Sequence, residues 1–167
     1  MAIREIRKVP DEILYKKCRE VTDFNDRLFT LLDDMYETMQ SANGVGLAGP
    51  QVGVLRRVAV VDTGEGRYEL INPKIIAWSK ETICEPEGCL SLPGESAEVR
   101  RPKSVTVETQ TRTGEKVQIS GNGLFARALC HEIDHLDGIL FIDKATNLCD
   151  SYEQYARLKA KEKKSKK

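Results

Sequence analysis

The chain has 167 residues, of which 40% are hydrophobic and 31% are charged. This length suits one domain that buries about 70% of the surface of its unfolded chain. The longest stretch without a charged residue, residues 38–55, contains four glycines and a proline, which excludes a membrane span. Residues 2–8 also lack the apolar core of a signal peptide, so we expect a soluble protein of the cytoplasm.

The charges balance overall but not along the chain. Basic and acidic residues each total 26, yet the last twelve residues, 156–167, hold seven basic residues and one acidic residue. A basic tail of this kind can bind nucleic acid or the ribosome, although it is most often a solvated helix end. We therefore carry a ribosome contact as a hypothesis for the tail and expect neither a DNA nor a membrane partner.

The first half of the chain predicts one helix and one hairpin. Apolar residues recur at helical spacing from Leu28 to Met39, and the pattern stops at Asn43, which indicates an amphipathic helix. The β-rich runs 57–62 and 67–76 flank a Thr-Gly-Glu-Gly turn, which is typical of a hairpin.

The second half predicts another hairpin and two more helices. Residues 105–107 and 117–119 alternate in polarity on either side of Thr113-Gly114. Residues 124–137 suit a helix with Asn122 as its N-cap and Gly138 as its stop, and a last helix starts near Asp150, where Ser151 and Gln154 could form a capping box. We predict an α+β fold with short antiparallel sheets around the central helix and a helix towards each terminus.

The central predicted helix carries the only two histidines, in the segment His131-Glu132-Ile133-Asp134-His135. Residues four apart share one helix face, so both imidazoles can reach one divalent ion. Glu132 lies about 100° around the helix, where it can contact another ligand of the ion without binding the ion itself. Two unrelated surface histidines are the alternative, and the glutamate between them argues against it.

A catalytic site of this type needs a third protein ligand and an open position for water. Three cysteines (Cys18, Cys130 and Cys149) fit better as small buried hydrophobic residues. Cys89 lies in the segment EGCLSLPG, whose glycines and proline favour an irregular backbone, whereas Cys84 has strand-like neighbours. If both Cys84 and Cys89 joined the histidines, the result would be a closed structural zinc site, and this alternative stays open.

The segment GVGLAGPQ, residues 44–51, begins with six residues that match a dinucleotide fingerprint. The match is weak because a helix, rather than a strand, precedes it. We favour a glycine-rich edge that the backbone of a ligand can approach, with Gln51 offering an amide N–H to a developing oxyanion. A glycine turn with a solvated glutamine is the alternative.

Together, the segments GVGLAGPQVG, EGCLSLPG and HEIDHLDG resemble, in this order, the three signature motifs of the peptide deformylase family. The resemblance runs from about residue 10 to residue 143. It implies a metal-dependent hydrolase that removes the N-formyl group from the N-terminal formyl-methionine of nascent polypeptides, with Fe²⁺ in the cell and with Zn²⁺, Ni²⁺ or Co²⁺ as alternatives. We accordingly expect one catalytic domain over residues 1–149 and a C-terminal helix with a basic tail over residues 150–167.

The resemblance also implies roles for individual residues. The metal ligands would be Cys89, His131 and His135, and the ion would lower the pKa of a water molecule so that hydroxide is available at neutral pH. Glu132 would act as general acid and base, and Gln51 and the backbone N–H of Leu90 would stabilise the oxyanion. The implied substrate-binding residues are Val45, Gly46, Gly88, Arg127 and Ala128.

Two positions depart from the family pattern. Gly49 replaces the usual alanine, which we expect to loosen the first loop, and Cys130 replaces a common glutamine. A general metallopeptidase with the same histidine motif is a further alternative, although such enzymes complete the site with a glutamate or a third histidine.

Overall fold

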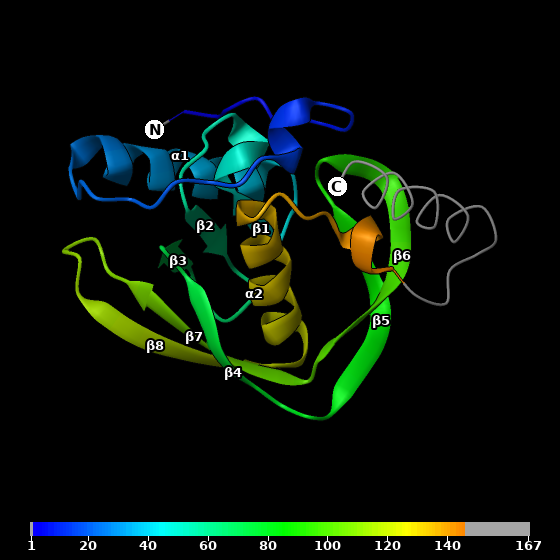
Figure 1. Cartoon of the computed structure of the whole chain (residues 1–167). Helices are drawn as coiled ribbons and strands as arrows, with labels where there is room; N and C mark the ends of the chain where they lie inside the picture. The colour runs from blue at the N-terminus through cyan, green and yellow to red at the C-terminus, as the bar shows by residue number, and fades with distance from the viewer. Residues whose placement is uncertain (1, 146–167) are drawn as a thin grey trace.

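The computed structural model describes residues 2–145 and confirms the predicted α+β fold (Figure 1). Within these residues, two α-helices and three short 3₁₀ segments accompany eight strands in three antiparallel sheets. The helices are α1 (Asp26–Ser41) and α2 (Gly123–Leu136), and the 3₁₀ segments are η1 (Glu12–Tyr15), η2 (Gly49–Val52) and η3 (Phe141–Lys144). The strands are β1 (Gly46–Ala48), β2 (Val58–Val61), β3 (Tyr68–Ile71), β4 (Lys74–Trp78), β5 (Thr82–Cys89), β6 (Leu92–Pro102), β7 (Ser104–Gln110) and β8 (Lys116–Asn122).

Helix α1 confirms the first predicted helix. The side chain of Asn25 caps its start by accepting a hydrogen bond from the backbone N–H of Leu28 at 3.1 Å. The chain then reverses at Asn43, whose φ of 57° lies in the left-handed region that asparagine tolerates. This reversal leads directly into β1.

The sheet β1-β2-β3 lies between the two helices. Alternate residues of its strands point to opposite faces, so Val58 and Val60 pack with α1, while Ala59 and Val61 pack with α2. β1 is an edge strand of this sheet and pairs with β2 in antiparallel register. The sheet therefore holds the glycine-rich segment beside the central helix.

The prediction of one hairpin over residues 57–76 is only partly right. β2 and β3 form the hairpin, but the chain leaves the sheet at Asn72, which has a φ of 51°. The side chain of Asn72 bonds both the N–H and the carbonyl of Val21, at 2.7 Å and 2.9 Å. The second half of the run is β4, which belongs to the sheet β4-β7-β8.

Each of the other two sheets contains one hairpin. β7 and β8 confirm the predicted hairpin, and Gly114 at its turn has a φ of 84°. β5 and β6 form a long hairpin that curves around one side of the molecule (Figure 1). The expected irregular backbone around Cys89 is confined to a register shift between Gly88 and Cys89 at the end of this hairpin.

Helix α2 runs through the middle of the fold, and every residue from 125 to 136 is buried. Asn122 is its N-cap residue, as predicted, although its side chain makes no capping hydrogen bond, and Gly138 ends the helical segment with a φ of 74°. No helix among residues 2–145 combines the length and the apolar character needed to cross a bilayer. The predicted final helix with its capping box, Cys149, the basic tail and the boundary at residue 150 all lie outside the described residues.

Candidate active site

Three donor atoms from two elements meet at one point. The hairpin supplies the thiol of Cys89 at the end of β5, and α2 supplies His131 and His135. Cys89 Sγ lies 3.3 Å from His135 Nε2, which lies 3.1 Å from His131 Nε2. Cys84 is not part of this group; its Sγ lies 4.0 Å from Glu98 Oε2, so the described residues do not assemble the four-ligand structural zinc site.

The triangle of donors fits a tetrahedral metal ion. With metal–nitrogen bonds of about 2.05 Å, two imidazole nitrogens of a tetrahedral site lie about 3.3 Å apart, close to the separation of the two histidines. Burial lowers the pKa of His135 well below its ordinary value. One sulfur and two nitrogens suit a divalent ion such as iron or zinc and leave a fourth position for other ligands.

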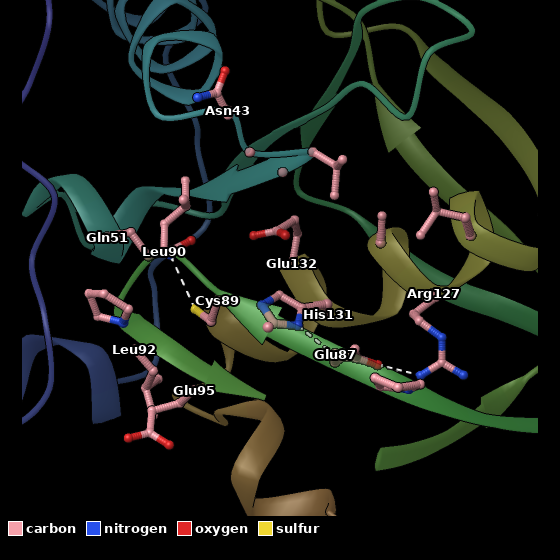
Figure 2. A pocket seen from close by; sticks show the side chains of 18 of the residues that line it. Asn43, Gln51, Glu87, Cys89, Leu90, Leu92, Glu95, Arg127, His131 and Glu132 are labelled. Atoms are coloured by element: carbon pink, nitrogen blue, oxygen red, sulfur yellow. Dashed lines mark hydrogen bonds and ion pairs between the residues drawn. The ribbon is translucent and has the colours of Figure 1, made fainter. Parts of the chain in front are cut away.

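His131 is oriented by a carboxylate. Its Nδ1 lies 2.8 Å from Glu87 Oε1 (Figure 2), and its Nε2 faces His135 Nε2. Burial alone would raise the pKa of Glu87, but hydrogen bonds from Arg101 and His131 hold this pKa well below its ordinary value of 4.5. Sequence reasoning gave Glu87 no role, although it stands two residues before Cys89 in the motif.

The side chain of Glu132, next to His131 in α2, reaches β1. Its side chain lies against Gly46, where an added Cβ would overlap Oε2 and would lie 2.8 Å from Cδ. Oε1 of Glu132 is buried and has no hydrogen-bond partner within residues 2–145, and burial raises the pKa of this carboxyl to about 7. Gly46, the second glycine of the segment GVGLAGPQ, therefore makes room for the carboxylate of Glu132. The spacing of the glycines did not indicate this function.

Gln51 is buried rather than solvated, with 1% of its surface exposed, which excludes the solvated-glutamine alternative. Its Oε1 accepts a hydrogen bond from the backbone N–H of Ala48 at 2.9 Å. Its Nε2 then points towards the donor group, 3.1 Å from Ser91 Oγ and 3.5 Å from Cys89 Sγ (Figure 2). Sequence reasoning missed Ser91, which holds this amide in place.

A cavity of about 440 Å³ opens beside these groups. Segments 43–46, 86–95 and 124–132 line it, and together with Gln51 they include all the predicted substrate-binding and catalytic residues: Val45, Gly46, Gly88, Leu90, Arg127, Ala128 and Glu132. Arg127 borders the cavity, but its guanidinium donates to Glu87 Oε2 at 2.6 Å and to the carbonyls of Val99 and Ile83, each at 2.8 Å. Its guanidinium therefore binds groups of the β5-β6 hairpin rather than the cavity.

The two departures from the family pattern have different outcomes. Cys130 is buried with 4% exposure, as expected of a small apolar residue, and Cys18 is similarly buried. At Gly49, however, an added Cβ would lie 2.7 Å from the carbonyl oxygen of Val54 and 2.8 Å from that of Arg56. The expectation that Gly49 loosens the first loop is wrong, because backbone carbonyl oxygens pack closely around this glycine.

Comparisons with known proteins agree with this geometry. The polypeptide deformylase family matches residues 3–151. The peptide deformylase of Acetivibrio thermocellus is 56% identical over 94% of this chain and 92% of its own length, and that of Alkaliphilus metalliredigens is 60% identical over 86% and 97%. The crystal structure of the peptide deformylase from Thermotoga maritima superposes with a TM-score of 0.84 at 41% identity, over 86% of this chain and 98% of that one. The chain belongs to the polypeptide deformylase family.

Proposed function

We propose that this protein removes the N-formyl group from N-terminal formyl-methionine of nascent polypeptides by metal-dependent hydrolysis. The proposal rests on one observation: a thiol and two imidazole donors converge beside the buried carboxylate of Glu132, at the wall of a cavity. Oε1 of this carboxylate has no hydrogen-bond partner among residues 2–145. Membership of the deformylase family supports the choice of a formyl amide as the bond that is cleaved.

Cys89, His131 and His135 would hold the metal. We infer from the family resemblance that Fe²⁺ is the ion used in the cell. Zn²⁺, Ni²⁺ or Co²⁺ could substitute for it, because a thiolate and two imidazoles accept each of these ions. When bound, a divalent ion polarises the formyl carbonyl and lowers the pKa of a water molecule from 15.7 towards about 7. Glu87 contributes by fixing the ring of His131 through Nδ1.

Glu132 would move the proton. A carboxyl with a pKa of about 7 can both accept and release a proton at neutral pH. Glu132 takes the proton from the attacking water and delivers it to the amine nitrogen as the carbon–nitrogen bond breaks. Formate and the free amino terminus then leave, and the carboxylate returns to its starting state.

Gln51 and the backbone N–H of Leu90 would stabilise the negative charge that develops on the formyl oxygen. Gln51 suits this role because Ala48 and Ser91 fix its amide before substrate arrives. A preorganised donor of this kind contributes about 3 kcal/mol to the transition state.

The peptide would bind along the open edge of β1, beside Val45 and Gly46, as an added strand. Main-chain hydrogen bonds accept many sequences, so selectivity would come from one apolar pocket for the methionine side chain. Val45 and Leu124 are exposed apolar residues at the cavity, with exposures of 44% and 54%. Gly88 and Ala128 also line the cavity.

We further propose that catalysis resides in residues 1–149 and that the protein works in the cytoplasm, where formylated chains emerge. The basic tail over residues 150–167 would contact the ribosome near the exit for nascent chains. Truncation after Tyr155 should then preserve hydrolysis of free peptides and weaken co-sedimentation with ribosomes. Unchanged co-sedimentation would remove the ribosome contact.

The function is tested with formyl-Met-Ala-Ser and acetyl-Met-Ala-Ser, each with and without a chelator. We expect formate release from the first peptide, loss of this activity with the chelator, and no reaction of the second peptide, whose acyl group is larger. Cleavage of internal peptide bonds would instead identify a general metallopeptidase. Full activity of the metal-free protein would contradict the proposal.

A further inference from the structure

We propose that Arg101 is a positioning residue that sets the distance between the hairpin bearing Cys89 and the helix bearing the two histidines. The inference rests on the metal site of the proposed function. The donors come from two elements, so their mutual geometry depends on what holds these elements together. Arg101 on β6 contacts a carboxylate from each of them.

One guanidinium joins the two carboxylates. Arg101 Nε and Nη2 donate to the two oxygens of Glu87 on β5, at 2.8 Å and 2.9 Å. Arg101 Nη1 donates to Asp134 Oδ2 on α2 at 2.5 Å. We call these three residues the arginine clamp.

Both ends of the arginine clamp lie beside metal-binding donors. Glu87 stands two residues before Cys89 and also contacts His131 Nδ1 at 2.8 Å. Asp134 immediately precedes His135 in the helix. A shift of either carboxylate would therefore move a donor on its own element relative to the donors on the other.

Burial and charge show why the residue is an arginine. Arg101, Glu87 and Asp134 are 3%, 7% and 9% exposed, and each carboxylate has a second basic partner, Arg127 for Glu87 and Lys144 for Asp134. A buried ion pair is weak evidence for a gain in stability, since desolvation opposes it. The planar guanidinium of an arginine does, however, fix the direction of hydrogen bonds from three nitrogens at once, which the ammonium group of a lysine cannot do. The observations thus favour a geometric role.

The test uses Co²⁺ alone as the probe, because its absorption bands report the geometry and the thiolate ligand directly. The variants are Arg101→Met, which removes the guanidinium, and Arg101→Lys, which keeps the charge without the guanidinium. Arg100→Met is the matched control, since the neighbouring Arg100 side chain is exposed and donates to Thr82 Oγ1 at 3.0 Å. Circular dichroism of the metal-free proteins confirms that each variant folds.

We expect Arg101→Met to weaken Co²⁺ binding by about 10- to 100-fold and to shift the Co²⁺ absorption bands. Arg101→Lys should show the same altered bands as Arg101→Met, with a smaller loss of Co²⁺ affinity. The Co²⁺ affinity of Arg100→Met should stay within about twofold of that of the unmodified protein. If Arg101→Met does not fold, Asp134→Asn decides, because it removes only the helical end of the clamp and preserves side-chain shape.

Unchanged affinity and bands in Arg101→Met, or in Asp134→Asn where that variant decides, would overturn the inference. Equal effects of Arg101→Met and Arg100→Met would also overturn it. The proposed function fails separately: if the unmodified protein binds Co²⁺ but releases no formate from formyl-Met-Ala-Ser, the deformylase proposal is wrong while the metal-binding results still judge the arginine clamp.

Discussion

Gly46→Ala should displace the carboxylate of Glu132, the proposed proton carrier, without unfolding the protein. The new Cβ would overlap Glu132 Oε2 and would lie 2.8 Å from Cδ and 3.0 Å from Cγ. Since nonbonded carbons rest about 3.5–4.0 Å apart, the side chain of Glu132 must move by about 1 Å. A misplacement of this size costs about 10² in rate. Gly46 has no positive φ, so alanine fits the backbone, and the change in unfolding free energy should stay within about 1 kcal/mol.

The assay is formate release from formyl-Met-Ala-Ser, measured together with metal content and melting temperature. Gly44→Ala is the control from the same segment: its Cβ would meet Leu90 Cδ1 at 2.7 Å, but this atom is the end of a flexible side chain that can turn aside. We expect Gly44→Ala to lose less than about tenfold in kcat and Gly46→Ala about a hundredfold. A Gly46→Ala protein with nearly full kcat and normal metal content would refute the placement of Glu132 against β1.

Five further substitutions test other parts of the site. Glu132→Gln should keep its metal, as measured by elemental analysis, while kcat falls by at least about two orders of magnitude; loss of the metal would make Glu132 a ligand. Cys89→Ser should lower metal content and Cys84→Ser should not, whereas loss of metal in both variants would favour the structural zinc site. Gly49→Ala should reduce the unfolding free energy by about 1–3 kcal/mol in urea titrations, and an unchanged midpoint would contradict the tight packing around it. The pKa of Glu87 in the folded state lies below its ordinary value of 4.5, so the ionised carboxylate stabilises the fold fully above pH 4.5 and this stabilisation is lost as the pH falls below that value. Glu87→Gln should therefore flatten the acid side of the pH–stability profile of the metal-free protein. Equally steep profiles of the two proteins would argue against the pairing.

Local patterns in the sequence predicted the elements that carry the chemistry. The spacing of His131 and His135 required only that residues 124–137 form a helix, and the structure confirms that helix. The β7-β8 hairpin was equally local, because its turn residues and alternation lie within one short stretch. The choice between Cys84 and Cys89 as third donor stayed open on the residues alone, since both precede the helix by a long segment.

Contacts between distant parts of the chain were not predictable. Arg101 meets Glu87 across a hairpin, 14 residues away, and Asp134 from 33 residues away, and no periodic pattern marks such a meeting. The break at Asn72 was hidden inside a continuous β-rich run, because it depends on hydrogen bonds to Val21, 51 residues earlier. These features arise only when the elements have packed.

The division of the donors between a hairpin and a helix gives the metal a part in folding as well as in chemistry. An ion that joins Cys89 to His131 closes a loop of about forty residues, and a cross-link of that span restricts the unfolded chain by about 4 kcal/mol if it acts as a disulfide does. Depletion of the ion would therefore shorten the lifetime of the polypeptide itself. Cellular metal supply would then govern how much of this enzyme survives, in addition to how fast each molecule turns over.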